Sequence, residues 1–309
     1  MQNATNISAH VASYFNGLNK RVTQKGNIGG YYSYALQLMR EHTYVYRARN
    51  GKRVDFDVSK NRPILDLHGS AYGHTQTWEY AGKENSWFVG VKPLKDSGWR
   101  WATQIARITF PKKFHSLSYS SNTQLPRLSW LRCAGNMTLD GPDFNRSEAA
   151  VTPDYQYMLI VTLSKSNRGY FSLYKLKDIN DALDKNGSRK DTKLTDIKAY
   201  AGFNIDLSSI NSFQGFDIDN DHNIYISSQK HPDGQKTHPR KIVKIPWNSQ
   251  SESDWQVVNL DPINLDWHNR QTELEGIQVL GNNHVYLTVS YHGDDGTQAP
   301  SRVYEVTWD

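Results

Sequence analysis

The sequence has one cysteine, Cys133, among 309 residues. A lone cysteine excludes an intrachain disulfide framework and a zinc site built from several thiolates. No stretch approaches the roughly 18 consecutive apolar residues of a membrane-spanning helix, and the mean hydropathy is −0.71. The N-terminus, Met-Gln-Asn-Ala-Thr-Asn-Ile-Ser, carries neither the basic nor the apolar segment of a secretory signal. We therefore expect no transmembrane segment and no cleavable signal.

Several familiar functional motifs are missing as well. The chain has no Gly-rich phosphate loop, no Gly-x-Ser-x-Gly and no His-Glu-x-x-His. Its 36 basic and 31 acidic residues give a net charge of +5, and the basic residues are spread along the chain rather than clustered. Nucleic acid is therefore not expected as a partner, while a mild positive charge is compatible with another anionic partner.

Short runs of alternating apolar and polar residues are abundant, and they predict strands. They occur as five pairs separated by polar loops: 34–39 with 44–48, 87–92 with 105–110, 158–163 with 170–176, 224–229 with 241–246, and 285–290 with 303–308. One short helix is predicted over 178–185, where Ile179, Ala182 and Leu183 share a face.

The paired runs belong to a repeat. In each unit a Gln or Glu stands twelve positions before an apolar strand residue; these are Gln24, Gln76, Glu148, Gln214 and Glu275. Outer strands are predicted at 64–68, 196–200 and 255–260. Repeated four-stranded units are typical of propeller blades.

The last repeat lacks an outer strand, which the run 11–15 can supply. We predict one domain, residues 1–309, folded as a five-bladed β-propeller of four-stranded antiparallel blades. The alternative is an all-β sandwich.

The innermost strands of a propeller line a central channel, so the five repeat residues and those just before them are candidate site residues. The set is Gln24, His74, Gln76, Arg146, Glu148, Gln214, Glu273 and Glu275. Such a mouth could bind a sugar or cation, or hydrolyse a substrate through Glu148 and Glu275. The alternative is that these polar groups contact ordered water in a crowded channel.

Asp217, Asp219 and Asp221 alternate as carboxylates do in a calcium loop. Against calcium, the sixth position is His222 rather than Gly, and the twelfth is Ser228 rather than a carboxylate. An ordinary polar turn is favoured, and no cofactor is expected. The loops 230–239 and 291–300 are either solvated connections or a recognition surface.

Several segments resemble the helveticin J family, the large class III bacteriocins of lactobacilli. They include Gly73-His-Thr-Gln-Thr-Trp-Glu79, Trp87-Phe-Val-Gly-Val-Lys-Pro93, Gln104-Ile-Ala-Arg107, Pro126-Arg-Leu-Ser129, Glu148-Ala-Ala-Val, Asp219-Asn-Asp, Asn223-Ile-Tyr-Ile-Ser-Ser-Gln-Lys230 and Tyr286-Leu-Thr-Val. The resemblance runs in collinear order from about Val22 to Trp308. His222 departs from it, because the family tends to have Gly there. The resemblance implies a secreted bactericidal protein without a cleaved signal, and it supplies no catalytic residues.

Three functions follow as hypotheses. In the first, the protein docks on an anionic polymer of the target cell envelope, a teichoic acid or a wall glycan, through the channel mouth and its loops. In the second, it hydrolyses envelope glycans with Glu148 and Glu275. In the third, it is an intracellular propeller scaffold without catalytic activity.

Overall fold

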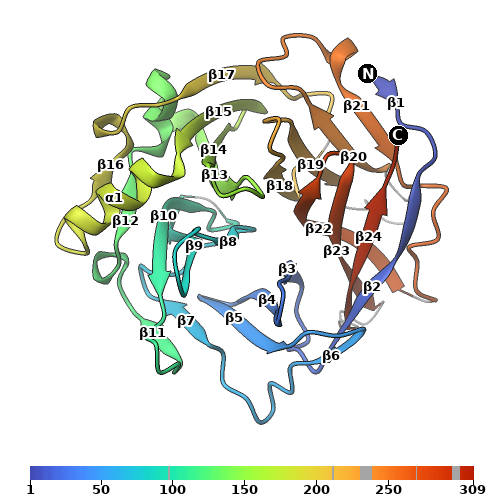
Figure 1. Ribbon diagram of the computed structural model, residues 1–309, viewed down its shortest axis with the longest axis horizontal. Coiled ribbons are helices and arrows are strands. Elements are labelled where there is room, and N and C mark those ends of the chain that lie inside the picture. Colours follow the sequence, from blue (N-terminus) through green and yellow to red (C-terminus); the bar gives the residue numbers. More distant parts are fainter. Residues whose placement is uncertain (97, 211, 230–238, 269, 294–299) are drawn as a thin grey trace. The chain divides into compact units, whose positions relative to one another are not determined.

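The computed structural model describes residues 1–309 except 97, 211, 230–238, 269 and 294–299 (Figure 1). Strands predominate. The α-helix among the described residues, α1 (Leu176–Asn186), covers and slightly extends the predicted helix. Its buried Leu176, Ile179 and Leu183 recur at the spacing of one helix face. The 3₁₀ turns are Asn122–Gln124, Leu131–Asn136, Gly141–Asp143, Leu194–Asp196 and Glu252–Asp254.

The chain divides into two compact units, each described by itself. Unit 1 comprises Met1–Met39, Tyr44–Ile64 and Ile210–Asp309, and unit 2 comprises Arg40–Thr43 and Leu65–Ser209.

Unit 1 contains two complete sheets. The first has the order β1 (Gln2–Asn3), β21 (Gln256–Asn259), β20 (Arg240–Ile245), β19 (Ile224–Gln229) and β18 (Gly215–Ile218). The second has the order β22 (Arg270–Gly281), β23 (His284–Gly293), β24 (Ser301–Thr307), β2 (Ser8–Asn16) and β6 (Arg53–Asp55).

Unit 2 also contains two sheets. One has the order β16 (Thr192–Lys193), β12 (Arg127–Ser129), β10 (Ala102–Thr109), β9 (Ser86–Pro93) and β8 (Trp78–Tyr80). The other has the order β13 (Phe144–Val151), β14 (Tyr157–Ser164), β15 (Arg168–Lys175) and β17 (Ala201–Asp206). The outer strand of this sheet is β17, so the prediction of a strand at 196–200 is wrong by a few residues. That segment starts in a 3₁₀ turn instead.

A fifth sheet has the order β11 (Leu117–Tyr119), β7 (Leu65–His68), β5 (His42–Arg49), β4 (Tyr32–Met39) and β3 (Thr23–Ile28). Five small sheets are the blades of a five-bladed β-propeller, and the fold prediction is confirmed. The structure adds one short parallel edge strand to four of the blades: β1, β6, β11 and β16.

The N-terminal strand completes the last blade, as predicted. In β2, residues from Ser8 to Phe15 pair antiparallel with β24, and β6 pairs with the other edge of β2. Phe15 is fully buried and meets the ring of Phe56 edge-on, with ring centroids 5.0 Å apart. The N-terminal segment is therefore part of both the sheet and the core of unit 1.

Candidate functional site

The five repeat residues all lie on the first strand of a sheet or within two residues before it. Those strands are β3, β8, β13, β18 and β22, and each stands at one end of its sheet's strand order. Gln24, Gln76, Glu148 and Glu275 are buried, whereas Gln214 is half-buried. Each predicted repeat residue therefore lies in or next to the first strand of a sheet.

In unit 1, two of these residues lie at β-bulges. The strand register shifts around Gln24 in β3 and around Glu275 in β22. Glycine is needed beside them, because a Cβ on Gly276 would stand 2.7 Å from the carbonyl oxygen of Gln24. A Cβ on Gly215 would stand 2.8 Å from the Cα of Gly276. The glycines that follow Gln214 and Glu275 therefore allow the first strands of unit 1 to approach closely.

The remaining candidates of unit 1 have local partners. Glu273 pairs with His292 of the neighbouring strand β23. The Gln214 amide donates to the hydroxyl of Ser212 at 3.4 Å. These contacts join neighbouring residues of unit 1.

Unit 2 brings four candidates together in one buried network around Glu148. The carboxylate accepts hydrogen bonds from the hydroxyls of Thr75 and Thr77, at 2.9 and 2.5 Å, and from the backbone N–H of Gln76. Arg146 Nε donates to the same carboxylate at 2.9 Å. Both Glu148 oxygens are thus occupied by donors, which is the arrangement of a structural carboxylate rather than of an exposed acid or base.

Arg146, a candidate site residue at the predicted channel mouth, is buried and does not present its charge to solvent. Its side chain is 3% exposed, and it also donates to the side-chain oxygen of Gln76. Its guanidinium lies 4.0 Å from the centroid of the Trp101 ring. Desolvation of a cation is tolerated here because the carboxylate, the amide and the aromatic ring all contact it. The charge stabilises the network instead of meeting a ligand.

His74 completes this network. Its ring stacks on Trp101 with centroids 3.8 Å apart and an interplanar angle of 13°, and its Nδ1 lies 3.2 Å from the carbonyl oxygen of Trp99. Burial, together with the charge of Arg146, lowers the pKa of His74 to about 3. The imidazole is therefore neutral near pH 7 and has no proton to give as a general acid there.

The carboxylates considered for calcium take part in a turn. Asp219 accepts from the backbone N–H groups of Asp221 and Asn223, at 3.0 and 2.8 Å, and from the hydroxyl of Tyr225. Asp217 accepts from the backbone N–H of Val279. These bonds are those of an ordinary polar turn, and calcium binding at Asp217, Asp219 and Asp221 stays the alternative hypothesis.

His222 lies at the tip of the same turn with φ of +66°. This left-handed conformation favours glycine, so a histidine adopts it at some cost in backbone strain. The predicted recognition loops, 230–239 and 291–300, lie mainly outside the described residues.

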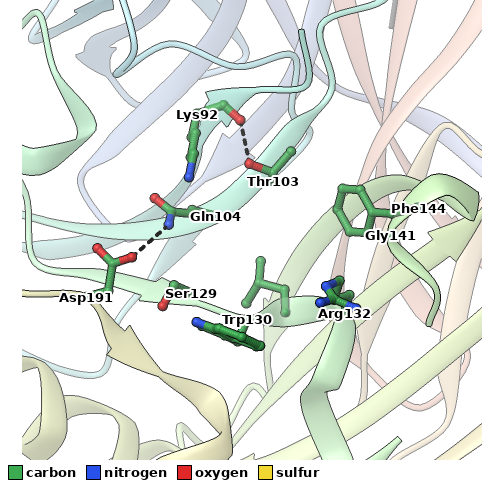
Figure 2. Close-up of a pocket in the computed structure, with 10 residues that line it drawn as sticks. Lys92, Thr103, Gln104, Ser129, Trp130, Arg132, Gly141, Phe144 and Asp191 are labelled. Atoms are coloured by element: carbon green, nitrogen blue, oxygen red, sulfur yellow. Dashed lines mark hydrogen bonds between the residues drawn. The ribbon is translucent and has the colours of Figure 1, made fainter. Parts of the chain in front are cut away.

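Unit 2 also has an open pocket of about 280 Å³ that sequence reasoning missed (Figure 2). Its lining comes from β9, β10, β12, the segment between β12 and β13, and the residue before β16. It includes Lys92, Gln104, Trp130, Arg132 and Asp191. Figure 2 shows the indole of Trp130 and the Arg132 side chain on one side, with Lys92 and Gln104 across from them. Trp130 also lines a second hollow of about 470 Å³, together with Lys193 and Thr195.

Trp130 is 47% exposed, although a tryptophan between two strand-like runs would ordinarily be assigned to the core. Its backbone is left-handed, with φ of +60° and ψ of +36°. For a bulky residue this conformation costs about 1–2 kcal/mol. The cationic groups of Arg132 and Lys193 lie 5.6 and 5.4 Å from its ring centroid. A strained backbone thus holds an exposed aromatic ring between positive charges.

Among the described residues, no helix is long and apolar enough to cross a membrane. The part of the chain that the structure describes is thus a β-propeller protein with a saturated polar network and an open aromatic and cationic pocket, both in unit 2.

Comparison with known proteins identifies the family. The model of the family named bacteriocin helveticin-J matches residues 3–309. Bacteriocin helveticin-J of Lactobacillus helveticus is 41% identical over 317 residues, which cover 93% of this chain and 92% of the relative. The chain belongs to the helveticin-J family, as its sequence motifs indicated, and this homology supports a bacteriocin role.

Solved structures show only distant likeness. The catalytic domain of a GH62 α-L-arabinofuranosidase from Coprinopsis cinerea is 10% identical, with a TM-score of 0.45, over 100% of this chain and 98% of that one. An aldose sugar dehydrogenase from Streptomyces coelicolor, in its PQQ-bound form, is 11% identical, with a TM-score of 0.40, over 98% and 99%. Likeness at this level extends no function to this chain.

Proposed function

We propose that this protein is a secreted bacteriocin that binds an anionic glycopolymer in the envelope of target Gram-positive bacteria. The binding site is the surface around Trp130 in unit 2, formed by the two hollows that this residue lines and called here the Trp130 pocket. The observation that carries the proposal is the exposed Trp130 ring, which lies between two hollows and beside two cations. This surface replaces the buried Arg146 as the candidate for recognition.

The chemistry of the pocket suits a polymer of sugars and phosphates. An exposed indole presents a flat apolar face on which the C–H face of a sugar ring can pack, and its N–H is a donor. The side chains of Lys92 and Lys193 are exposed, and no ion pair is found for them within the described part of the chain. Asp191, by contrast, is paired with Arg127. Asp196 is an exposed carboxylate at the second hollow, but Lys92, Arg132 and Lys193 leave the net charge around the indole positive.

The test is sedimentation of the full-length protein with isolated cell walls, together with inhibition titres on target cells. Because Trp130 would be a central contact, Trp130→Ala should lose about thirtyfold or more in wall affinity and should lose killing in parallel. Lys92→Glu and Lys193→Glu should weaken binding less. Their deficits should shrink as salt rises, because charges in solvent are screened over roughly 10 Å at 0.1 M salt.

Matched controls separate the pocket from general effects. Trp99→Ala removes another exposed tryptophan, and Lys20→Glu makes the same change of net charge at an exposed lysine of unit 1. Both should bind walls and kill like the parent protein. A folded Trp130→Ala variant with unchanged binding would refute the pocket. Release of reducing sugars from the walls would instead favour the hydrolase hypothesis.

A further inference from the structure

We propose that His42, Asp66 and His68 form a binding site for a divalent cation of the zinc type. This site lies apart from the Trp130 pocket and does not rest on the proposed function. Asp66 and His68 alternate along β7, so their side chains leave the same face of the strand. His42 begins the neighbouring strand β5.

The geometry brings both imidazoles to one carboxylate oxygen. Oδ1 of Asp66 lies 2.7 Å from Nδ1 of His42 and 3.7 Å from Nδ1 of His68. The two rings stack with centroids 5.3 Å apart and an interplanar angle of 26°. One potential ligand atom from each residue lies within 4.8 Å of the other two. In a tetrahedral zinc site, neighbouring ligand atoms are about 3.3 Å apart. The two measured distances lie on either side of that value, and small side-chain rotations would bring them to it.

His68 supplies an independent observation. Its Nδ1 atom is inaccessible to solvent, yet this atom has no hydrogen-bond partner among the described residues. A bound cation between the two rings would be the partner of this nitrogen. The three side chains remain 26–37% exposed, so an ion can reach them from solvent.

The donor set selects the class of cation. Two imidazoles and one carboxylate suit Zn²⁺, which often takes three protein ligands and leaves a fourth position for water. Ca²⁺ and Mg²⁺ prefer sets made of oxygen ligands and should bind weakly here. A bound ion would cross-link β5 to β7, so it should raise the melting temperature.

The test is calorimetric titration of the full-length protein, carrying no histidine tag, with ZnCl₂. We expect one saturable site whose affinity falls tenfold or more in His68→Gln and in Asp66→Asn. The control His115→Gln removes an exposed histidine outside the cluster and should bind Zn²⁺ like the parent. Equal Zn²⁺ affinity in folded His68→Gln and in the parent would overturn the proposal.

A second measurement needs no variant. Co²⁺ added to the parent protein should give the visible absorption of a four-coordinate site, and Zn²⁺ should abolish it by competition. Absence of that absorption, or of saturable Zn²⁺ heat, would also overturn the proposal. CaCl₂ should neither produce comparable heat nor displace Co²⁺.

Discussion

Acid should destabilise this protein through His74. The folded state holds the imidazole against Trp101 and beside the Arg146 guanidinium. Burial and that neighbouring charge both disfavour the protonated ring, so the pKa falls from 6.5 to about 3. In the unfolded chain the same ring is exposed to water and titrates near its ordinary pKa.

The direction of the effect follows from these two values. At pH values between these two pKa values, the unfolded state binds a proton that the folded state excludes. The free energy of unfolding therefore decreases as the pH falls. The stability that His74 contributes is fully present above about pH 6.5, and it is lost progressively as the pH falls toward 3. Each pKa unit corresponds to about 1.4 kcal/mol. At pH 4.5 the free energy of unfolding should therefore be lower by about 2–3 kcal/mol.

Urea unfolding of the parent and of His74→Gln, at about pH 7 and pH 4.5, checks this value. The glutamine cannot titrate, so the variant should lose about 2–3 kcal/mol less on acidification than the parent. Burial raises the pKa of the Asp184 and Asp266 carboxyls, but hydrogen bonds and charges from Lys83 and Arg107, and from Thr272 and Arg240, lower each pKa overall. Both carboxyls are common to the two proteins and cancel in the difference. Equal losses in the two proteins would refute the burial and charge argument.

Two further perturbations test the fold. Deletion of residues 1–15 should abolish the cooperative melt, because it exposes the edge of β24 and removes the buried Phe15; Phe15→Ala alone should cost about 3–5 kcal/mol. A truncated protein that melts within a few degrees of the parent would contradict closure by β2. Arg146→Gln and Glu148→Gln should each cost about 3–5 kcal/mol, because each leaves a buried charge without its partner. In the double variant the cost should be well below the sum, and additive unfolding energies would exclude direct coupling.

The repeat could be predicted from the sequence because its signals are local. Apolar residues at alternate positions, Ile224 and Ile226 in β19 and Val285 and Leu287 in β23, predict strands and are fully buried. The Gln214-Gly and Glu275-Gly pairs recur where the first strands approach each other. The parallel edge strands could not be predicted in this way. β1 and β16 contain two residues each, too few to show any period, and their partners are distant in sequence.

The Trp130 pocket was also beyond sequence reasoning. Its walls come from β9, β10 and the segment after β12, and no spacing in the chain reports that these segments meet. The exposure of Trp130 depends on its left-handed backbone, and tryptophan is not a residue that ordinarily indicates such a conformation.

The burial of Arg146 determines which variants can test recognition of the target. A sequence shows that Arg146 and Glu148 are two residues apart on a strand, which places them on the same face. It does not show that a neighbouring segment covers that face and supplies Thr75, Gln76 and Thr77 as further donors. Reversing the charge of Arg146 inside this network would destabilise the fold. A loss of killing by such a variant would therefore not report on binding. Lys92 and Lys193 are exposed at the pocket, where a reversed charge leaves the core intact. Variants at these lysines can therefore separate recognition of an anionic polymer from stability of the propeller.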